Sequence, residues 1–99
     1  MATYSLSSGA EKDAMDIWWH SFHKWSKDQA DKYYNELFET INSLTRDPYL
    51  GRPQNHLFKG CLKYNYRSHY IMYEVVDDGI FVIRILHQCM NVEERMKGN

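Results

Sequence analysis

The feature that most constrains this chain is a long β-hairpin pattern in its last third. Two runs rich in β-branched and aromatic residues, 68–76 and 80–87, flank the short segment Asp77-Asp78-Gly79. Asp78-Gly79 is expected to supply the positive φ angles of a tight two-residue turn, which makes the two runs neighbouring antiparallel strands. Arg84 lies inside the otherwise apolar second strand. A charge there requires a face that is solvated, paired or used for recognition.

The simplest register of this hairpin divides its side chains between two faces, because side chains alternate along a strand. The predicted core face holds Ile71, Tyr73, Val75, Phe81, Ile83 and Ile85. The opposite face holds Tyr70, Met72, Glu74, Val82 and Arg84. A single small sheet leaves such a second face at least partly open. Arg84 is therefore expected either to pair with Glu74 across the hairpin or to form part of a recognition surface.

Two consecutive helices are predicted between a short N-terminal strand, residues 3–6, and a loop at 48–60. Ser8 with Glu11, and Ser26 with Gln29, have the spacing of helix capping boxes. Apolar residues then recur every three or four positions, with the clearest stripe from Ala30 to Leu44. Asp47-Pro48 is expected to end the second helix. Joined by a minimal link, the two helices should form an antiparallel hairpin.

The alternation of Leu62, Tyr64 and Tyr66 with polar residues predicts a third half-buried strand, and residues 91–97 predict a short terminal helix. The order of elements gives an α+β fold, with the N-terminal strand and the helical hairpin packed on a small antiparallel sheet. Chain length predicts one domain over residues 1–99. Trp25, Tyr33 and Tyr34 are predicted core aromatics. Trp18 and Trp19 are adjacent, so one of them, Trp19, is expected at the surface.

Composition restricts the functional classes. Twelve Lys and Arg against thirteen Asp and Glu give a net charge of −1, whereas phosphate-binding domains usually carry a basic excess. No apolar run approaches the ~20 residues of a membrane span and no signal peptide is evident, which predicts a cytoplasmic protein. Cys61 and Cys89 lack metal-ligand spacing and are expected to be free thiols. No cofactor or metal is predicted, since His20 and His23 lack a third ligand.

Several motifs together resemble the ParE-like toxins of the RelE/ParE superfamily. They are Ser68-His69-x-Ile71-x-Tyr73, Arg84-Ile85-Leu86-His87-x-x-Met90, Trp25-Ser26-x-x-Gln29-Ala30-x-x-Tyr33, Asp47-Pro48-x-x-Gly51 and Gly60. The resemblance covers nearly the whole chain. It implies a toxin of a type II toxin-antitoxin pair that binds and inhibits DNA gyrase and blocks replication, without catalysis of its own. It also implies neutralisation by a cognate antitoxin, with a toxin-antitoxin hetero-oligomer as the stored form.

The expected target-binding residues are Arg84, His87, Arg67, Trp19 and Met90. Arg84→Ala is expected to weaken activity while costing only ~0–1 kcal/mol of stability, the value for an exposed pair. For His87 a structural alternative is a hydrogen bond to a backbone carbonyl that closes the core.

Two other functions stay open from the sequence. One is a RelE-like ribosome-dependent mRNA endoribonuclease, for which Arg67, Arg84 and His87 would be the catalytic candidates. Positions where those relatives carry arginine are taken by Tyr70 or Ile71, and Gln88-Cys89-Met90-Asn91 lacks their terminal basic and aromatic pair. The other is a domain that has lost toxicity and only binds an antitoxin.

Overall fold

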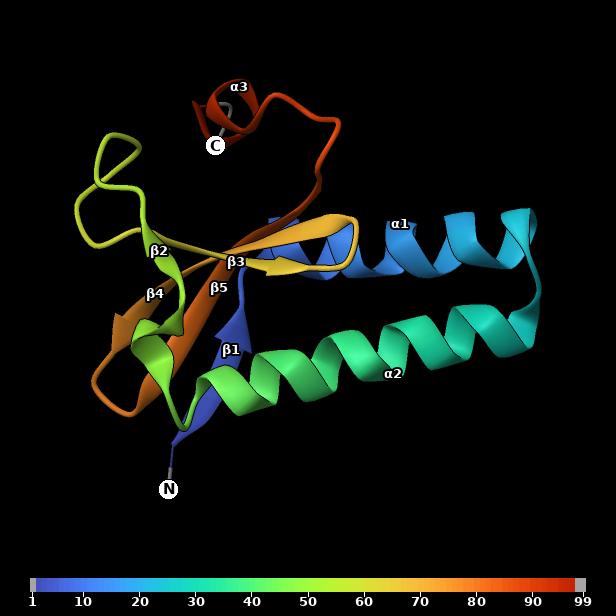
Figure 1. Cartoon of the computed structure of the whole chain (residues 1–99), viewed down its shortest axis with the longest axis horizontal. Coiled ribbons are helices and arrows are strands. Elements are labelled where there is room, and N and C mark those ends of the chain that lie inside the picture. Colours follow the sequence, from blue (N-terminus) through green and yellow to red (C-terminus); the bar gives the residue numbers. More distant parts are fainter. Residues whose placement is uncertain (1, 98–99) are drawn as a thin grey trace.

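The computed structural model describes residues 2–97, in which a long helical hairpin is joined to a five-stranded sheet (Figure 1). In chain order the elements are β1 (Thr3–Leu6), α1 (Ser8–Lys24), α2 (Lys27–Leu44), the 3-10 helix η1 (Pro48–Leu50), β2 (Arg52–Pro53), β3 (Leu62–Tyr66), β4 (His69–Val76), β5 (Gly79–His87) and α3 (Val92–Lys97). The predicted α+β class is confirmed. None of the described helices combines the length and apolar character that a membrane span requires.

The predicted N-cap is confirmed for α2, and for α1 it lies one residue earlier than predicted. Ser26 caps α2 by accepting a hydrogen bond from the Gln29 amide, as predicted. The cap of α1 is Ser7 rather than Ser8: its hydroxyl accepts from the Ala10 amide and also donates to the carbonyl of Ile83. The Ser7 hydroxyl therefore links the start of α1 to strand β5 by a hydrogen bond. Helix propensities do not predict this contact, because the two residues are far apart in the sequence.

The strand order is β1-β5-β4-β3-β2, and the N-terminal strand β1 lies parallel to β5. The predicted small antiparallel sheet is thus mixed, with β2 to β5 antiparallel and β1 added in parallel at the edge. The tight turn is Asp77-Asp78, since Val76 pairs with Gly79. Asp78 does not take the expected positive φ. Gly79 is required for a different reason: a Cβ there would lie 1.6 Å from the carbonyl oxygen of Thr3.

A β-bulge changes which side chains of the hairpin face the helices. Met72 pairs with Arg84 but Tyr73 pairs with Val82, so Ile83 is the extra residue on β5. The two-residue turn pairs Tyr73 with Val82, which puts Val82 in the main core, and the bulge then returns Ile85 to the same face beside Ile71. The prediction that placed Val82 on the outer face was wrong, as was the assignment of Phe81 and Ile83 to the core. The prediction fails near the turn because a two-residue turn pairs odd-numbered residues of β4 with even-numbered residues of β5, and it holds at Ile71 and Ile85 because the bulge shifts the pairing by one residue.

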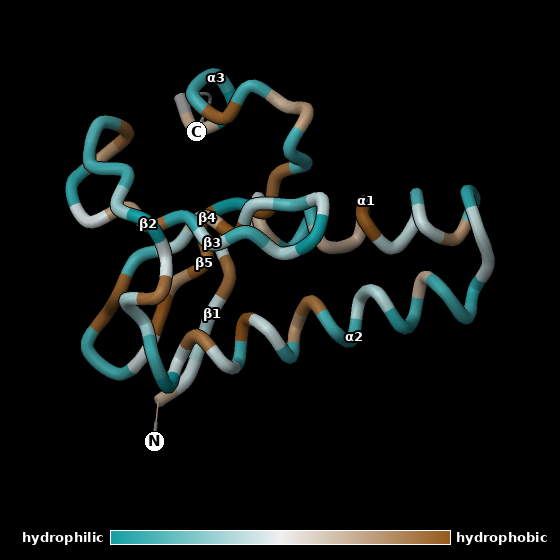
Figure 2. Tube along the Cα trace, viewed as in Figure 1, coloured by the Kyte–Doolittle hydropathy of each residue, from teal (hydrophilic) through white to brown (hydrophobic). Residues whose placement is uncertain are grey.

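The main core lies between the helical hairpin and one face of the sheet, with Ala14, Leu37, Ile41 and Leu44 buried against the strands. Figure 2 shows these apolar positions recurring along α1 and α2. The opposite face of the sheet was predicted to be at least partly open, but its central residues are covered by other parts of the chain. Met72 and Leu86 are fully buried there beneath Leu57, Phe58, Val92 and Met96, which come from the 54–61 loop and α3.

Candidate functional site, a cleft between the first helix and the sheet

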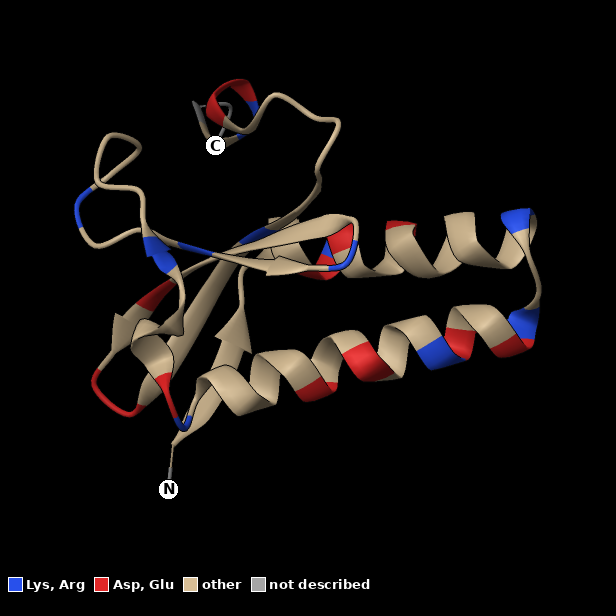
Figure 3. Cartoon of the chain, in the orientation of Figure 1, with Lys and Arg blue, Asp and Glu red and all other residues tan. Residues whose placement is uncertain are grey.

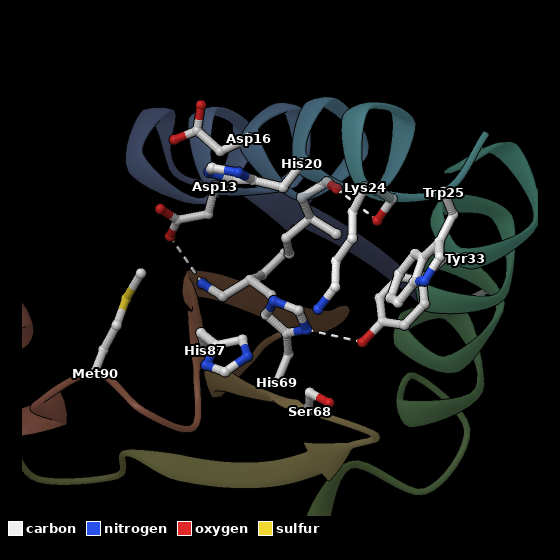
Figure 4. A pocket seen from close by; sticks show the side chains of 13 residues that line it. Asp13, Asp16, His20, Lys24, Trp25, Tyr33, Ser68, His69, His87 and Met90 are labelled. Atoms are coloured by element: carbon white, nitrogen blue, oxygen red, sulfur yellow. Dashed lines mark hydrogen bonds between the residues drawn. The ribbon is translucent and has the colours of Figure 1, made fainter. Parts of the chain in front are cut away.

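A cleft of about 460 Å3 opens between α1 and the ends of β4 and β5 (Figure 4). One face of α1 forms one wall, with residues that recur every three or four positions and so point the same way: Asp13, Asp16, Ile17, His20, Ser21 and Lys24. The facing residues are Tyr33 of α2, Ser68, His69, Ile85, His87 and Met90, with Trp25 at the end of α1. This is within the size range of ligand-binding clefts.

Arg84 lies beside this cleft and is paired with Asp13 of α1. Its Nε and Nη2 donate to the two carboxylate oxygens of Asp13 at 2.7 and 3.0 Å. The same carboxylate accepts from the backbone amide of Ile85 at 2.9 Å. The two side chains are only 16% and 12% exposed. Hydrogen bonding to Asp13 raises the pKa of the Arg84 guanidinium, which stays charged.

The arrangement of α1 explains this pair. β1 ends at Leu6, and the chain turns into α1, which lies along the part of β5 that β1 leaves uncovered. The Asp13 carboxylate therefore accepts the hydrogen bond of the Ile85 amide on β5, which a neighbouring strand would otherwise accept. The predicted pairing of Arg84 with Glu74 was wrong, and Arg84 is not on an open face. Its role in target binding stays a prediction, but its geometry is that of a part-buried structural ion pair.

His69 is held at the base of the cleft by two aromatic neighbours. Its Nδ1 is 2.8 Å from the Tyr33 hydroxyl, and its ring meets His87 edge-on with centroids 5.1 Å apart. Burial, with a further contribution from His87, lowers the pKa of His69 to about 4. His69 is thus a neutral hydrogen-bonding group at neutral pH. The Nδ1 of His87 accepts from the Cys89 amide, so the expected bond from His87 to a carbonyl is replaced by this one.

The depressed pKa of His69 predicts a specific loss of stability in acid. Between the ordinary value of 6.5 and about 4, the unfolded chain binds a proton that the folded chain excludes. Lowering the pH from 6.5 to 4 should therefore reduce the free energy of unfolding, by about 2 kcal/mol after allowance for partial solvent access. Above pH 6.5 this contribution is complete. Urea unfolding at pH 7 and 4.5 should show a smaller difference for His69→Gln than for the parent; equal differences would contradict the assignment.

The five predicted target-binding residues do not form one surface. His87 and Met90 line the cleft, and Arg84 lies next to it through Asp13. Arg67 lies in the β3–β4 turn, where its Nη2 is 2.7 Å from Glu36 and its guanidinium lies near the rings of Tyr33 and Tyr66.

Trp19 lies on the other side of α1, away from the cleft. It is 56% exposed, which confirms the prediction that Trp19 is the exposed member of the Trp18–Trp19 pair. Its ring contacts Phe22 and His23, and Phe22 also stacks on Trp18. Trp25, predicted to be in the core, is instead 60% exposed and forms one end of the cleft. Because it follows the last helical residue, the helical stripe does not extend to it.

Among the residues that line the cleft, Lys24, Tyr33 and His69 were not predicted as site residues, and His20 was considered only as a metal ligand. The spacing of His20 and Lys24 from Ile17 places them on one helical face, and this was the available signal. Their opposite wall comes from strand ends distant in sequence, which the pattern of α1 does not reveal. Within residues 2–97 no group of three or more His, Cys, Asp and Glu side chains is placed to hold a metal ion.

Figure 3 shows Lys and Arg interspersed with Asp and Glu along the helices α1 and α2. Arg67 and Arg84, which adjoin the cleft residues Ser68 and Ile85 in the sequence, are each paired with a carboxylate. The two cysteines are free, as predicted, with Cys61 buried and Cys89 exposed. Burial raises the pKa of the Cys61 thiol to about 11, which excludes it as a nucleophile at neutral pH.

Comparison with known proteins gives a consistent result. The family model described as "ParE toxin of type II toxin-antitoxin system, parDE" matches residues 4–92. Toxin ParE1 of Caulobacter vibrioides is 35% identical over 96 residues, which cover 97% of this chain and 99% of that protein. Toxin ParE1 of Mycobacterium tuberculosis is 34% identical over 94 residues, covering 94% of this chain and 96% of that protein.

Two solved structures share the fold. One is described as the chromosomal ParDE TA system from P. aeruginosa, with a TM-score of 0.75, 19% identity, and coverage of 88% of this chain and 96% of that one. The other is a YoeB-YefM complex from Staphylococcus aureus, with a TM-score of 0.54, 20% identity, and coverage of 88% and 97%. The fold, the motifs and the match over residues 4–92 agree, and the chain belongs to the ParE toxin family of type II toxin-antitoxin systems.

Proposed function

We propose that this protein arrests growth by binding DNA gyrase and inhibiting it, without catalysing a reaction itself. The observation that carries the choice of target is the pairing of the two arginines near the cleft. Arg84 is tied to Asp13 and Arg67 to Glu36. A nuclease would need such cations unpaired, to stabilise the charge that develops on the scissile phosphate. Action on gyrase would place the protein in the cytoplasm.

The proposal includes a cognate antitoxin that binds the toxin and keeps it inactive as a hetero-oligomer. A solved structure of the same fold is described as a ParDE TA system, which supports this partner. The net charge of −1 argues against direct binding to nucleic acid. A domain that has lost toxicity and only binds an antitoxin is the alternative, and growth after induction of the chain alone distinguishes the two.

A supercoiling assay tests the gyrase proposal directly. Purified toxin added to gyrase, relaxed plasmid and ATP is expected to reduce supercoiling and to leave linear DNA after detergent and protease treatment, because trapped cleavage complexes release broken ends. Heat-denatured toxin should have no effect, and the cognate antitoxin should restore supercoiling. Full supercoiling at a large molar excess of folded toxin would contradict the proposal.

The same proposal predicts that purified toxin does not cleave messenger RNA in a translating extract, because its arginines are already paired with carboxylates. Primer extension across a reporter message is the measurement, with an unrelated folded protein as the control. Codon-specific cuts would overturn the prediction and favour the RelE-like alternative. Arg67, Arg84 and His87 would then be the first residues to mutate.

A further inference from the structure

We infer that two copies of this chain associate about a two-fold axis through a second apolar face of α1. This outer stripe consists of Met15, Trp18, Trp19 and Phe22, which recur every three or four positions and so share one side of the helix. The core side of the same helix holds a different set: Ala10, Ala14, Ile17 and Ser21. Packing within the domain therefore accounts for only one of the two apolar faces of α1.

The outer stripe is a continuous aromatic surface that the domain leaves largely in water. Met15, Trp19 and Phe22 are 58%, 56% and 37% exposed. The ring of Phe22 stacks on both Trp18 and Trp19, with centroids 5.3 and 6.1 Å apart. The Trp18 indole also donates to Asp31 of α2 at 2.9 Å, which fixes its ring before any partner arrives. A contiguous exposed patch of this kind is typical of a protein-protein contact.

The shape of the molecule gives a second copy access to this stripe. The helical hairpin extends well beyond the sheet, and α1 forms one side of it (Figure 1). The residues that flank the stripe, from Glu11 to His23, are exposed as well. Two such helices can approach to the 8–10 Å that is usual for packed helices.

The distribution of charge along α1 favours a second copy in antiparallel orientation. Glu11 and Asp16 give the first half of the helix a negative character, which the exposed partner Lys12 offsets only in part. The last turn is basic, with His23 and Lys24. A two-fold axis beside Trp18 and Trp19 places Met15 opposite Phe22, and Glu11 near His23 of the second copy. The two helix dipoles are then also aligned favourably.

The same charges disfavour other occupants of the stripe. Nucleic acid and anionic membranes both require a basic surface around the apolar contact. Here the stripe is flanked by the carboxylates of Glu11, Asp16 and Asp31. A second copy needs no such surface, because each half of the stripe is complementary to the other half under a two-fold axis.

The size of the stripe predicts a weak dimer. An aromatic side chain buries about 150–250 Å2 when it is fully covered, and part of that area is already covered within the domain. The interface therefore falls below the ~800 Å2 per partner of a stable complex. We expect a dissociation constant of about 50 µM, so that the dimer forms only in concentrated protein.

Sedimentation equilibrium of the purified full chain tests the dimer. Between about 5 and about 500 µM the average mass should rise from one copy toward two. Over the same dilution series, the 15N signals of the Met15 and Phe22 amides and of the Trp19 indole should shift. Trp19→Ala should raise the dissociation constant at least about tenfold, as expected for a central aromatic contact. Tyr49→Ala is the control, because Tyr49 is 73% exposed and lies on η1, outside the stripe.

A charge exchange tests the orientation of the two helices. Glu11→Lys and His23→Glu should each weaken association about threefold, because each brings like charges together across an antiparallel pair. The double variant Glu11→Lys/His23→Glu restores opposite charges and should associate like the parent. In a parallel pair Glu11 would face its own copy, and neither the single losses nor the recovery would be seen. Circular dichroism of each variant checks that the fold is intact.

Several results would overturn the inference. They are a monomeric mass at every concentration, unchanged association of Trp19→Ala, shifts confined to residues outside the outer stripe, or a double charge variant that stays as weak as the single ones. Loss of toxicity in Trp19→Ala with unchanged association would assign the stripe to the target instead. The inference does not rest on the proposed function, since these masses and signals are measured without gyrase or an antitoxin.

Discussion

Leu37→Asp is expected to abolish soluble folding. Leu37 is 0% exposed and lies in the main core between α2 and the sheet. Removal of its packing costs about 2–5 kcal/mol, by comparison with other large-to-small core changes. The carboxylate would be buried without a partner, which adds several kcal/mol more. The sum approaches or exceeds the ~5–15 kcal/mol that stabilises a typical domain.

The measurement is the soluble fraction after expression, followed by circular dichroism of any soluble protein. Asn35→Asp is the matched control, because it introduces the same carboxylate at an exposed position of the same helix. The control should remain folded and close to the parent in thermal stability. A folded Leu37→Asp protein with an unchanged melting temperature would show that this stripe of α2 does not pack against the sheet.

Asp13→Ala is expected to cost about 3 kcal/mol of stability, the typical effect of removing one partner from a mostly buried ion pair. Two groups lose their acceptor at once, the guanidinium of Arg84 and the backbone amide of Ile85. Arg84→Ala is expected to cost a similar amount of stability, since it leaves the Asp13 carboxylate without its cationic partner. This replaces the expectation of ~0–1 kcal/mol that an exposed pair with Glu74 would give.

Urea unfolding of the single variants and of Asp13→Ala/Arg84→Met measures these costs. The double variant should recover part of the loss, because neither charge is then buried alone. Asp16→Ala is the control: its pair with Lys12 is exposed on the same helix and should contribute less than about 1 kcal/mol. If Arg84→Ala proves as stable as the parent but loses toxicity, Arg84 is a target-binding residue as the sequence predicted.

Much of the fold is encoded locally and could be read from the sequence. The capping chemistry of Ser26, the apolar stripe of α2 and the alternation in β3 each depend on neighbours within a few residues. These predictions were accurate because hydrogen bonding and burial act at that range. The motifs around His69 and Arg84 likewise identified the family before any coordinates.

The candidate site was predicted only in part. His87 and Met90 were chosen and do line the cleft, whereas Trp19 lies on the far side of α1. Lys24 was not chosen because no local pattern distinguishes it from a surface lysine, and His69 was read as part of a family motif but not as a site residue. The structure places both in the lining of the cleft, Lys24 on α1 and His69 at the start of β4.

The sequence by itself determined the order of the elements, the helical stripes and membership of the ParE toxin family. Only the tertiary structure decided the partner of Arg84, the bulge at Ile83 and the parallel placement of β1. The physical reason is that these contacts join residues far apart in the sequence. Asp13 and Arg84 are separated by 71 positions and meet because α1 covers the edge of β5 where β1 ends. No periodicity in either segment carries that information, since the pairing depends on how separate elements pack.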